Sequence, residues 1–398
     1  MPKIEDVLER ESRTVDLEQG DFERLLGRRE RKERNRRIRA GALGVIVALA
    51  AGFVLIRSLT SDGVPATPPA DPRPVPAAAG TLAYELDGDI YVADPDGSNA
   101  VKIADGVSDG EDCEGSSGER YGAEGPMWSP DGRYLAYRAV DCSDPTSWGS
   151  GVITDSEGNV VARFPRQGWE IAWSPDSTRV AVWEGTFETI GIYGLDGARQ
   201  ALLEMPSGWS PSGDHDPKWM PDGTSVWLEE WELPIDGSPP RRLPPTGGDP
   251  YATYSPDGSH VAYGDIGGLG LIVTRSDGSE YQRVFPRQVG LGDNWGHPWS
   301  PTGDRIAFTT QVRGPASPTE VNVVDVATGS VTTLAEGEPG ATLRAIGFSP
   351  RGDRILFSSI LFSKNGRMVE SSLWSVGVDG SDLRLLVAGT SQGEWLLR

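Results

Sequence analysis

Trp128-Ser129-Pro130-Asp131-Gly132 is the first of six copies of one phrase in this chain. The other copies keep most of the pattern aromatic-Ser-Pro-Asp-Gly, and they begin at Trp173, Trp219, Tyr254, Trp299 and Phe348. Their starting points are 35 to 49 residues apart, with a mean of about 44, the length of a four-stranded propeller blade. A unit of this size cannot bury a core alone, so the repeats predict sheets that stack on one another.

Each copy has the composition of a strand, a tight turn and a second strand. The serine accepts hydrogen bonds from the backbone, the proline presets φ, and the glycine adopts the positive φ that ends the turn. An alternating apolar segment follows, in which residues two apart share a face of the sheet. These segments include 134–137, 180–183, 261–263, 306–308 and 355–357.

A second series contains seven hairpin turns, one before the first copy, five between copies and one after the last. The turns are Asp96-Gly97, Glu157-Gly158, Asp196-Gly197, Asp236-Gly237, Asp277-Gly278, Thr328-Gly329 and Asp379-Gly380. The first unit, Thr81 to Ala104, has such a turn but no aromatic-Ser-Pro strand before it. The residues Glu394 to Arg398 lie where a further unit would place its innermost strand.

Seven outer turns and six phrases together predict an all-β fold, a seven-bladed β-propeller over residues 81–398. One blade is split between the two ends of this region, because pairing 394–398 with the first unit leaves no exposed sheet edge. The alternative is a six-bladed ring, in which 81–104 is an appended hairpin and the C-terminal residues fray.

The composition agrees with an all-β chain and excludes one class of partner. Among 398 residues, 51 are Gly, 31 are Pro and 13 are Trp, which suits many short strands joined by tight turns. The formal charge is -21, from 37 Lys and Arg against 58 Asp and Glu. A nucleic-acid-binding face must neutralise phosphates with basic side chains, so this charge disfavours nucleic acid as a partner.

The N-terminal region predicts a single membrane-spanning helix. Residues 28–39 carry eight Lys and Arg side chains against two Glu, and residues 40–56 contain no charged or polar side chain before Arg57. This length is the lower end of a transmembrane span. The competing interpretation is a signal peptide, but some forty residues precede the apolar run and no Ala-x-Ala site follows it.

The basic cluster orients the predicted span at 40–57. Because positively charged flanks stay inside, the tail at 1–39 is expected in the cytoplasm and the rest of the chain outside it. Residues 58–80 contain six prolines among Ala, Thr and Asp, which predicts an extended spacer between membrane and propeller. The localisation predicted from these features is the cytoplasmic membrane, single-pass, with the propeller exported.

The repeats resemble those of TolB-type, WD-repeat-like β-propellers of bacterial envelopes, whose motif is aromatic-Ser-Pro-Asp-Gly followed by an apolar strand. The resemblance covers essentially all of residues 81–398. It implies the fold, whereas propellers of this kind serve as binding platforms, sensors and accessory domains of peptidases. TolB itself is soluble, usually six-bladed and preceded by another domain, so its partners do not transfer to this chain.

The two cysteines, Cys113 and Cys142, fall in two loops of one predicted blade that open on the same face of a propeller. On the exported side of a membrane disulfides persist, so the sequence predicts a disulfide between them, with two free thiols as the alternative.

Catalytic and metal-binding patterns are weak. Gly106-Val107-Ser108-Asp109-Gly110 matches Gly-x-Ser-x-Gly, but that motif acts on a strand-to-helix elbow and this stretch is predicted as an inter-blade loop. Asp94, Asp96 and Ser98 lack the spacing of a calcium loop and are assigned to a turn, and His260 to a half-buried strand position. The sequence predicts no catalytic residue, no metal site and no cofactor.

An acidic stretch and several loop tryptophans are the remaining candidates. A solvated surface loop is the interpretation preferred over a cation or basic-partner site for Asp105, Asp109, Glu111, Asp112, Glu114, Glu119 and Glu124. Binding residues are expected in the inter-blade loops around the channel mouth, where tryptophans bury large area at modest entropic cost. They are Trp148, Trp169, Glu170, Trp209, Asp214, His215, Asp293, Trp295 and His297. The alternative is that these tryptophans cap hydrophobic gaps between blades.

The function predicted from the sequence is a non-catalytic binding or sensor ectodomain that recognises a protein, peptide or glycan in the cell envelope. One alternative is an envelope hydrolase or lyase that uses propeller carboxylates. Another is a transmembrane regulator whose N-terminal tail binds a cytoplasmic partner such as a sigma factor. The sequence predicts neither an oligomeric state nor the identity of the ligand.

Overall fold

The structure is a computed structural model, and the part of the chain that it describes is the propeller region. The described residues are 77, 80–105, 122–139, 149–165, 167–184, 188–206, 209, 217–228, 230–243, 252–264, 270–285, 290–291, 298–311, 319–338, 340–363, 368–390 and 392–397. Among them, no helix has the length and hydrophobicity needed to span a bilayer. The predicted cytoplasmic tail at 1–39 and span at 40–57 lie outside these residues.

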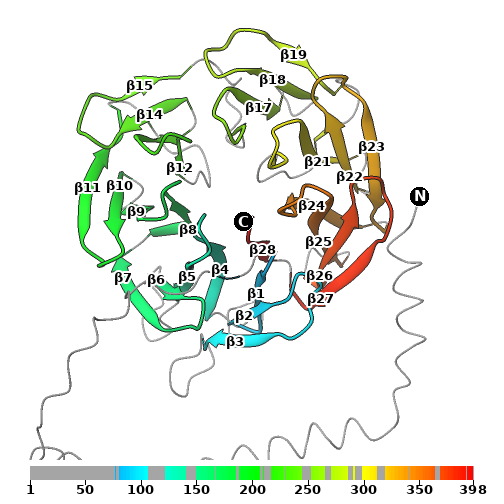
Figure 1. Ribbon diagram of the computed structural model, residues 1–398, viewed down its shortest axis with the longest axis horizontal. Coiled ribbons are helices and arrows are strands. Elements are labelled where there is room, and N and C mark those ends of the chain that lie inside the picture. The colour runs from blue at the N-terminus through cyan, green and yellow to red at the C-terminus, as the bar shows by residue number, and fades with distance from the viewer. Residues whose placement is uncertain are drawn as a thin grey trace, which may run out of the picture. The chain divides into compact units, whose positions relative to one another are not determined.

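The described residues form seven four-stranded antiparallel sheets, which follow one another around a ring (Figure 1). Blade 1 contains β28 (Gly393–Trp395), β1 (Leu82–Leu86), β2 (Asp89–Ala93) and β3 (Val101–Ala104). Blade 2 contains β4 (Ala123–Trp128), β5 (Tyr134–Ala139), β6 (Ser150–Asp155) and β7 (Val160–Pro165). Blade 3 contains β8 (Gln167–Trp173), β9 (Arg179–Glu184), β10 (Thr189–Gly194) and β11 (Arg199–Glu204).

The other four blades follow the same order, from the innermost strand outward. Blade 4 contains β12 (Lys218–Trp219), β13 (Ser225–Leu228), β14 (Trp231–Pro234) and β15 (Arg241–Arg242). Blade 5 contains β16 (Thr253–Tyr254), β17 (His260–Gly264), β18 (Leu271–Arg275) and β19 (Gln282–Arg283). Blade 6 contains β20 (Gly290–Leu291), β21 (Arg305–Gln311), β22 (Thr319–Asp325) and β23 (Val331–Glu336). Blade 7 contains β24 (Ala341–Phe348), β25 (Arg354–Phe362), β26 (Met368–Gly377) and β27 (Arg384–Ala388).

The repeated phrase forms the turn between the innermost strand and the second strand. In blade 2 the N–H of Gly132 donates to the carbonyl of Ser129 at 2.8 Å, and Gly132 has a φ of 71°. The Ser129 hydroxyl donates to Asp131 at 2.8 Å and accepts from the N–H of Tyr134 at 3.0 Å. One serine and one carboxylate therefore hold the turn closed, which explains why this phrase recurs.

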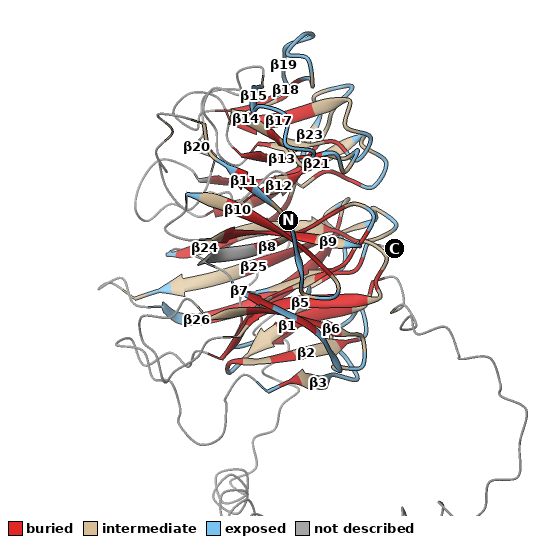
Figure 2. Cartoon of the chain, turned by 90° about the vertical axis from the view of Figure 1, so that its left-hand side faces the viewer, coloured by how far each residue is buried: buried red, intermediate tan, exposed pale blue. Residues whose placement is uncertain are grey.

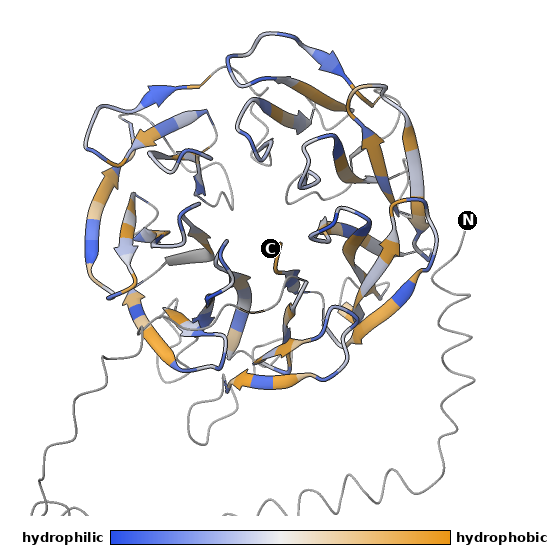
Figure 3. Cartoon of the chain, viewed as in Figure 1, coloured by the Kyte–Doolittle hydropathy of each residue, from blue (hydrophilic) through white to orange (hydrophobic). Residues whose placement is uncertain are grey.

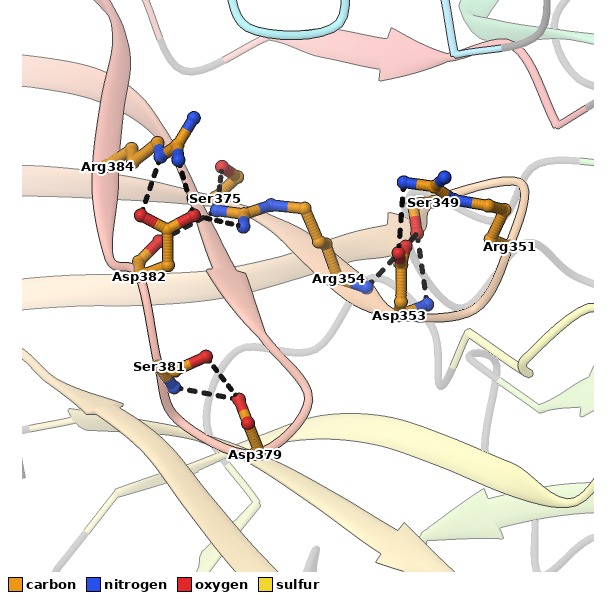
Figure 4. Close-up of polar contacts among 9 residues, drawn as sticks. All are labelled: Ser349, Arg351, Asp353, Arg354, Ser375, Asp379, Ser381, Asp382 and Arg384. Carbon is orange, nitrogen blue, oxygen red and sulfur yellow. Dashed lines mark hydrogen bonds and ion pairs between the residues drawn. The ribbon is translucent and has the colours of Figure 1, made fainter.

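Two copies of the phrase lack the aspartate, and both compensate two residues later. In blade 7 the phrase has Arg351 in place of aspartate, and the Ser349 hydroxyl donates instead to Asp353 at 2.7 Å (Figure 4). In blade 6 the corresponding Ser300 hydroxyl donates to Asp304 at 2.7 Å. The carboxylate is thus supplied to every such serine by one of two nearby positions.

The hydrophobic core lies between blades. Seven buried clusters are found among the described residues, and each contains side chains from two neighbouring blades. Tyr134 and Ile153 of blade 2, for example, pack with Val180 and Val182 of blade 3. On the rim of the ring the strands are less uniformly apolar. Figure 3 shows hydrophilic stretches that interrupt the hydrophobic ones along the outermost strands β3 and β11. A single blade therefore exposes its apolar faces unless its neighbours cover them.

The tryptophans of the phrase also link neighbouring blades through their indole N–H groups. In three of them the acceptor is the carbonyl of the residue just before the aromatic position of the preceding blade. The pairs, each 3.0 or 3.1 Å apart, are Trp173 with Met127, Trp219 with Ala172 and Trp299 with Thr253. The aromatic residue of the phrase thus contributes both apolar burial and a directional contact between innermost strands.

The predicted ring closure is confirmed. β28 pairs with β1, with Trp395 opposite Leu82 and Gly393 opposite Tyr84, so blade 1 is split between distant parts of the sequence. The strand covers Gly393–Trp395 and not 394–398. Leu397 follows this strand and is 53% exposed.

The connections between strands differ at the two ends of the ring. Because antiparallel strands alternate in direction, the turns within strand pairs one–two and three–four leave at one end, here called the short-turn face. The other connections leave at the opposite end, here called the long-connection face, and include residues 105–122, 140–149, 205–217 and 243–252. In the side view of Figure 2, the C-terminus lies at the right edge of the ring, and β25 and β26 extend to the left edge.

Candidate functional site: the channel mouth on the long-connection face

The innermost strands lose their regular pairing toward the long-connection face. In blade 3, Ala172 pairs with Ala181 but Gln167 pairs with Trp183, so β8 contains more residues than the stretch of β9 opposite it. In blade 2, Glu124 pairs with Arg138 and Met127 with Ala136, and the bulge is at Gly125, whose φ is 61°. Bulges re-aim side chains and are frequent beside binding and active sites.

Blade 6 carries the longest irregularity. Leu291 pairs with Thr310, and the next contact along this innermost strand is the bridge between Trp299 and Ile306. From one pair to the next the sequence advances by eight residues on the innermost strand and by four on β21. Asp293, Trp295 and His297 fall in this interval, and they lie outside the described residues.

The sequence placed Trp169 and Glu170 in an inter-blade loop, and this placement is wrong. Both residues belong to β8, within the segment of irregular pairing. The connection between β7 and β8 is only Arg166, so the strand begins almost at once after the preceding blade. Their predicted role in binding stays a prediction, now at a bulged innermost strand.

Trp209 lies in the connection between β11 and β12, as predicted. Its ring stacks on Trp183, with centroids 5.6 Å apart and planes 22° from parallel, and it packs against the apolar cluster shared by blades 3 and 4. This contact agrees with the alternative interpretation, in which the loop tryptophans cap hydrophobic gaps between blades and do not bind a ligand. Trp148, Asp214 and His215, as well as Cys113 and Cys142, lie outside the described residues, so their roles and the disulfide stay predictions.

Glu124 was expected in a solvated acidic loop, and this expectation is wrong. It lies in β4, where it forms an ion pair with Arg138 of β5, and the two side chains are only 9% and 7% exposed. A buried charge needs a partner because transfer from water is costly, and each of these residues supplies the other's. The pair anchors the strand ends from which the connections 105–122 and 140–149 leave.

A contact from blade 1 reaches the same bulge. The side-chain carbonyl of Gln392 accepts a hydrogen bond from the N–H of Gly125 at 3.0 Å. The N–H of Glu85 in turn donates to the carbonyl of Gln392 at 3.2 Å. The lip of the channel between blades 1 and 2 is therefore built from backbone groups held by residues far apart in sequence.

A second polar group, in blade 3, joins the two ends of the sheet: Glu184 ends β9 on the long-connection face, whereas Tyr193 and Arg199 pair beside the short turn between β10 and β11. The hydroxyl of Tyr193 donates to Glu184 at 2.5 Å, and Arg199 donates to the other oxygen of Glu184 at 2.9 Å. Burial raises the pKa of Tyr193, and the hydrogen bond to Glu184 raises it further. Tyr193 therefore stays protonated as a donor at neutral pH, and Glu184 is engaged within the fold.

Blade 6 repeats the arrangement with uncharged donors. The Thr310 hydroxyl donates to Glu320 at 3.1 Å and accepts from the side-chain amide of Asn322 at 3.0 Å, although Thr310 and Asn322 are almost fully buried. The polar groups at the mouth in blades 2 and 6 thus find their partners within their own blade, as does the Glu184 group of blade 3. Sequence reasoning missed them, although an ionisable residue directly after an apolar segment, as at Arg138 and Glu184, was an available signal.

The described residues bear out two minor assignments. Asp94 and Asp96 close a turn: the Ser98 N–H donates to Asp96 at 3.0 Å and the Asn99 side chain to Asp94 at 2.7 Å. His260 begins β17 at a partly buried position, as predicted. Within the described part of the chain, no group of three or more His, Cys, Asp or Glu side chains has a metal-binding arrangement. The Gly106–Gly110 segment lies outside that part.

The geometry defines the class of protein: a closed, seven-bladed β-propeller whose innermost strands are bulged in blades 2 and 3. No family model matches the chain. An uncharacterized protein of Agrobacterium fabrum is 26% identical over 267 residues, which cover 59% of this chain and 83% of that protein.

Solved structures with similar folds are diverse. A candidate 6-phosphogluconolactonase of Bacteroides fragilis has a TM-score of 0.48 at 13% identity, over 79% of this chain and 97% of that one. A dihydro-heme d1 dehydrogenase has a TM-score of 0.48 at 15% identity, over 82% and 78%. A candidate TolB of Agrobacterium tumefaciens has a TM-score of 0.35 at 17% identity, over 66% and 79%. The propeller assignment rests on the seven sheets described above, and no activity is transferred from these structures.

Proposed function

We propose that this chain is a non-catalytic binding propeller, anchored in the cytoplasmic membrane by residues 40–57, whose ligand docks at the channel mouth on the long-connection face. The observation that carries the proposal is that two features lie at the same end of the ring. The longest connections and the irregular innermost strands of blades 2, 3 and 6 lie at the same end of a closed ring. A rigid scaffold that positions variable loops is the common design of binding proteins.

The polar groups at the mouth support binding over catalysis. A general acid or base must be within reach of a substrate proton. Glu124 is buried against Arg138, and Glu320 accepts from Thr310, so both carboxylates are occupied by the fold. The ligand classes that suit loops rich in tryptophan are peptides, protein surfaces and glycans, because indole rings stack on extended apolar faces.

A ligand screen tests the proposal. The full chain in detergent micelles is titrated with a panel of envelope-derived peptides and glycan fragments, and the melting temperature is recorded, because a ligand that binds the folded state raises it. We expect at least one class to raise the melting temperature in a saturable way. Trp169→Ala and Trp295→Ala should abolish that shift.

The control is Arg351→Ala on the short-turn face, where the Arg351 side chain is 85% exposed and pairs only with Asp353 at 3.2 Å among the contacts described. This variant should keep the ligand-induced shift. Saturable hydrolysis of any panel member that is lost in the Trp169 or Trp295 variants would overturn the non-catalytic assignment. A shift lost equally in Arg351→Ala would overturn the assignment of the site.

A further inference from the structure

The chain enters the propeller through the short-turn face. The N–H of Ala77 donates to the carbonyl of Gly132, in the turn of blade 2, at 2.8 Å. Three residues on, the N–H of Gly80 donates to the carbonyl of Leu396 at 2.8 Å, and the N–H of Leu396 donates back to Thr81 at 3.0 Å. These contacts hold the last residues of the predicted spacer against one end of the ring.

The entry point lies where the turns of several blades meet. Gly80 has a φ of 85°, and a Cβ at this position would lie 3.1 Å from Pro95 of blade 1 and 3.8 Å from Pro350 of blade 7. Ala77 packs against the apolar cluster of blades 1 and 2. The path of the chain into β1 is therefore fixed by blades 7, 1 and 2 together, close to the turns that surround the channel axis.

The opposite end of the ring carries the proposed ligand site. β25 extends from Arg354 to Phe362, and at about 3.3 Å per residue its length is about 26 Å. The turn of Arg351 lies at one end of this strand, and Val369, the second residue of β26, lies at the other end, on the long-connection face. A tether fixed near the centre of the short-turn face would have to pass around the rim before the opposite face could approach the membrane.

We infer that the propeller is held over the membrane by its short-turn face, and that the long-connection face is directed away from the lipid toward a macromolecular partner in the envelope. This inference rests on the proposed function, because it takes residues 40–57 as the anchor and the channel mouth as the ligand site. It assigns the kind of partner: one that approaches from the side away from the bilayer, and not the lipid surface itself.

Depth-dependent quenching in liposomes tests the orientation without any ligand. A fluorophore is attached to Arg351→Cys on the short-turn face or to Val369→Cys on the long-connection face, two exposed positions of the same blade. The full chain is reconstituted into liposomes that contain lipids with a quencher on the headgroup. The wild-type chain, treated with the same reagent, corrects for labelling of Cys113 and Cys142, and unchanged melting temperatures show that the variants fold.

We expect quenching at Arg351→Cys to be at least twofold stronger than at Val369→Cys. Equal quenching, or stronger quenching at Val369→Cys, in chains that float with the liposomes would overturn the orientation and leave the anchor and the ligand site intact. A chain that does not float with liposomes would overturn the membrane anchor and this inference with it. The ligand screen is a separate measurement, so a negative screen with the expected quenching would count against the binding function alone.

Discussion

The carboxylate of Glu394 accepts a 2.7 Å hydrogen bond from the backbone N–H of Trp128. The two residues belong to the innermost strands of blades 1 and 2, at opposite ends of the propeller sequence. At three other junctions the link between innermost strands is an indole N–H that donates to a carbonyl, whereas the buried indole N–H of Trp128 has no hydrogen-bond partner among the described residues. At the closure the acidic side chain supplies a contact between innermost strands like the one that the indole supplies at those three junctions.

Truncation after Gly393 should destabilise the whole ring. It removes the contact between Glu394 and Trp128 and the buried side chains of Trp395 and Leu396, each worth roughly 1.5 to 3 kcal/mol. We expect a loss of about 3 to 6 kcal/mol in the free energy of unfolding, measured by chemical denaturation, together with lower solubility from the exposed edge of β1. Leu397→Ala is the control, because that side chain is mostly exposed and should change stability by less than about 0.5 kcal/mol. An unchanged unfolding midpoint after truncation would show that the closure strand contributes little.

Breaking the buried ion pair should cost more than breaking an exposed one. Glu124→Gln or Arg138→Met leaves one buried charge uncompensated, and we expect each to lower the free energy of unfolding by about 3 to 5 kcal/mol. The double variant should recover part of this loss, because no lone charge then remains. The matched control is Arg242→Met, whose partner Glu230 is also exposed, and which should cost less than about 1 kcal/mol. Additive effects of the two buried substitutions would contradict the pairing.

The turn carboxylates should make stability fall at acid pH. Partial burial would raise the pKa of Asp176, but hydrogen bonds from Ser174 and Thr178 outweigh it and lower the pKa to about 2. Hydrogen bonds from Ser255 and Ser259 lower the pKa of Asp257 to about 2 as well. Because these pKa values are lower in the folded chain, the stabilisation is complete above the unfolded value near 4, and is lost as the pH falls from about 4 to 2.

The measurement is the melting temperature of the chain between pH 5 and pH 2. We expect the double variant Asp176→Asn with Asp257→Asn to melt at a lower temperature than wild type at pH 5, and to lose less on acidification. Glu188→Gln, at an exposed position, serves as the surface control and should follow the wild-type curve. Parallel curves for wild type and double variant would exclude these two groups as the acid-sensitive ones.

Substitution of Trp209 distinguishes a role in covering the hydrophobic core from a role in binding the ligand. Because its ring stacks on Trp183 and packs on the cluster of blades 3 and 4, Trp209→Ala should lower the free energy of unfolding by about 2 kcal/mol. Trp209→Phe should restore most of it, since a smaller ring still covers Trp183. A variant with normal stability and weakened ligand binding would instead assign Trp209 to the ligand site.

The blade count could be predicted from the sequence because each blade depends on local chemistry. The serine, proline and glycine of the phrase determine one turn over five residues, and the hydrogen bonds that close this turn in blade 2 lie within the segment from Ser129 to Tyr134. The substitution of Asp131 by threonine or arginine in other copies is also local, since Asp304 and Asp353 take its place two residues later. The closing strand was predictable as well, because seven outer turns and only six copies of the phrase left one innermost strand to be supplied from elsewhere in the chain.

The sequence by itself thus determined the sheet type, the number of blades and the strand that closes the ring, because hydrophobic alternation and turn geometry depend on neighbouring residues. The channel mouth was decided by the tertiary structure alone. Register depends on which strand lies opposite, so the bulge that takes Trp169 and Glu170 into β8 cannot be read from one strand. The burial of Glu124 also depends on Arg138 across the sheet, since only a partner of opposite charge makes removal from water affordable.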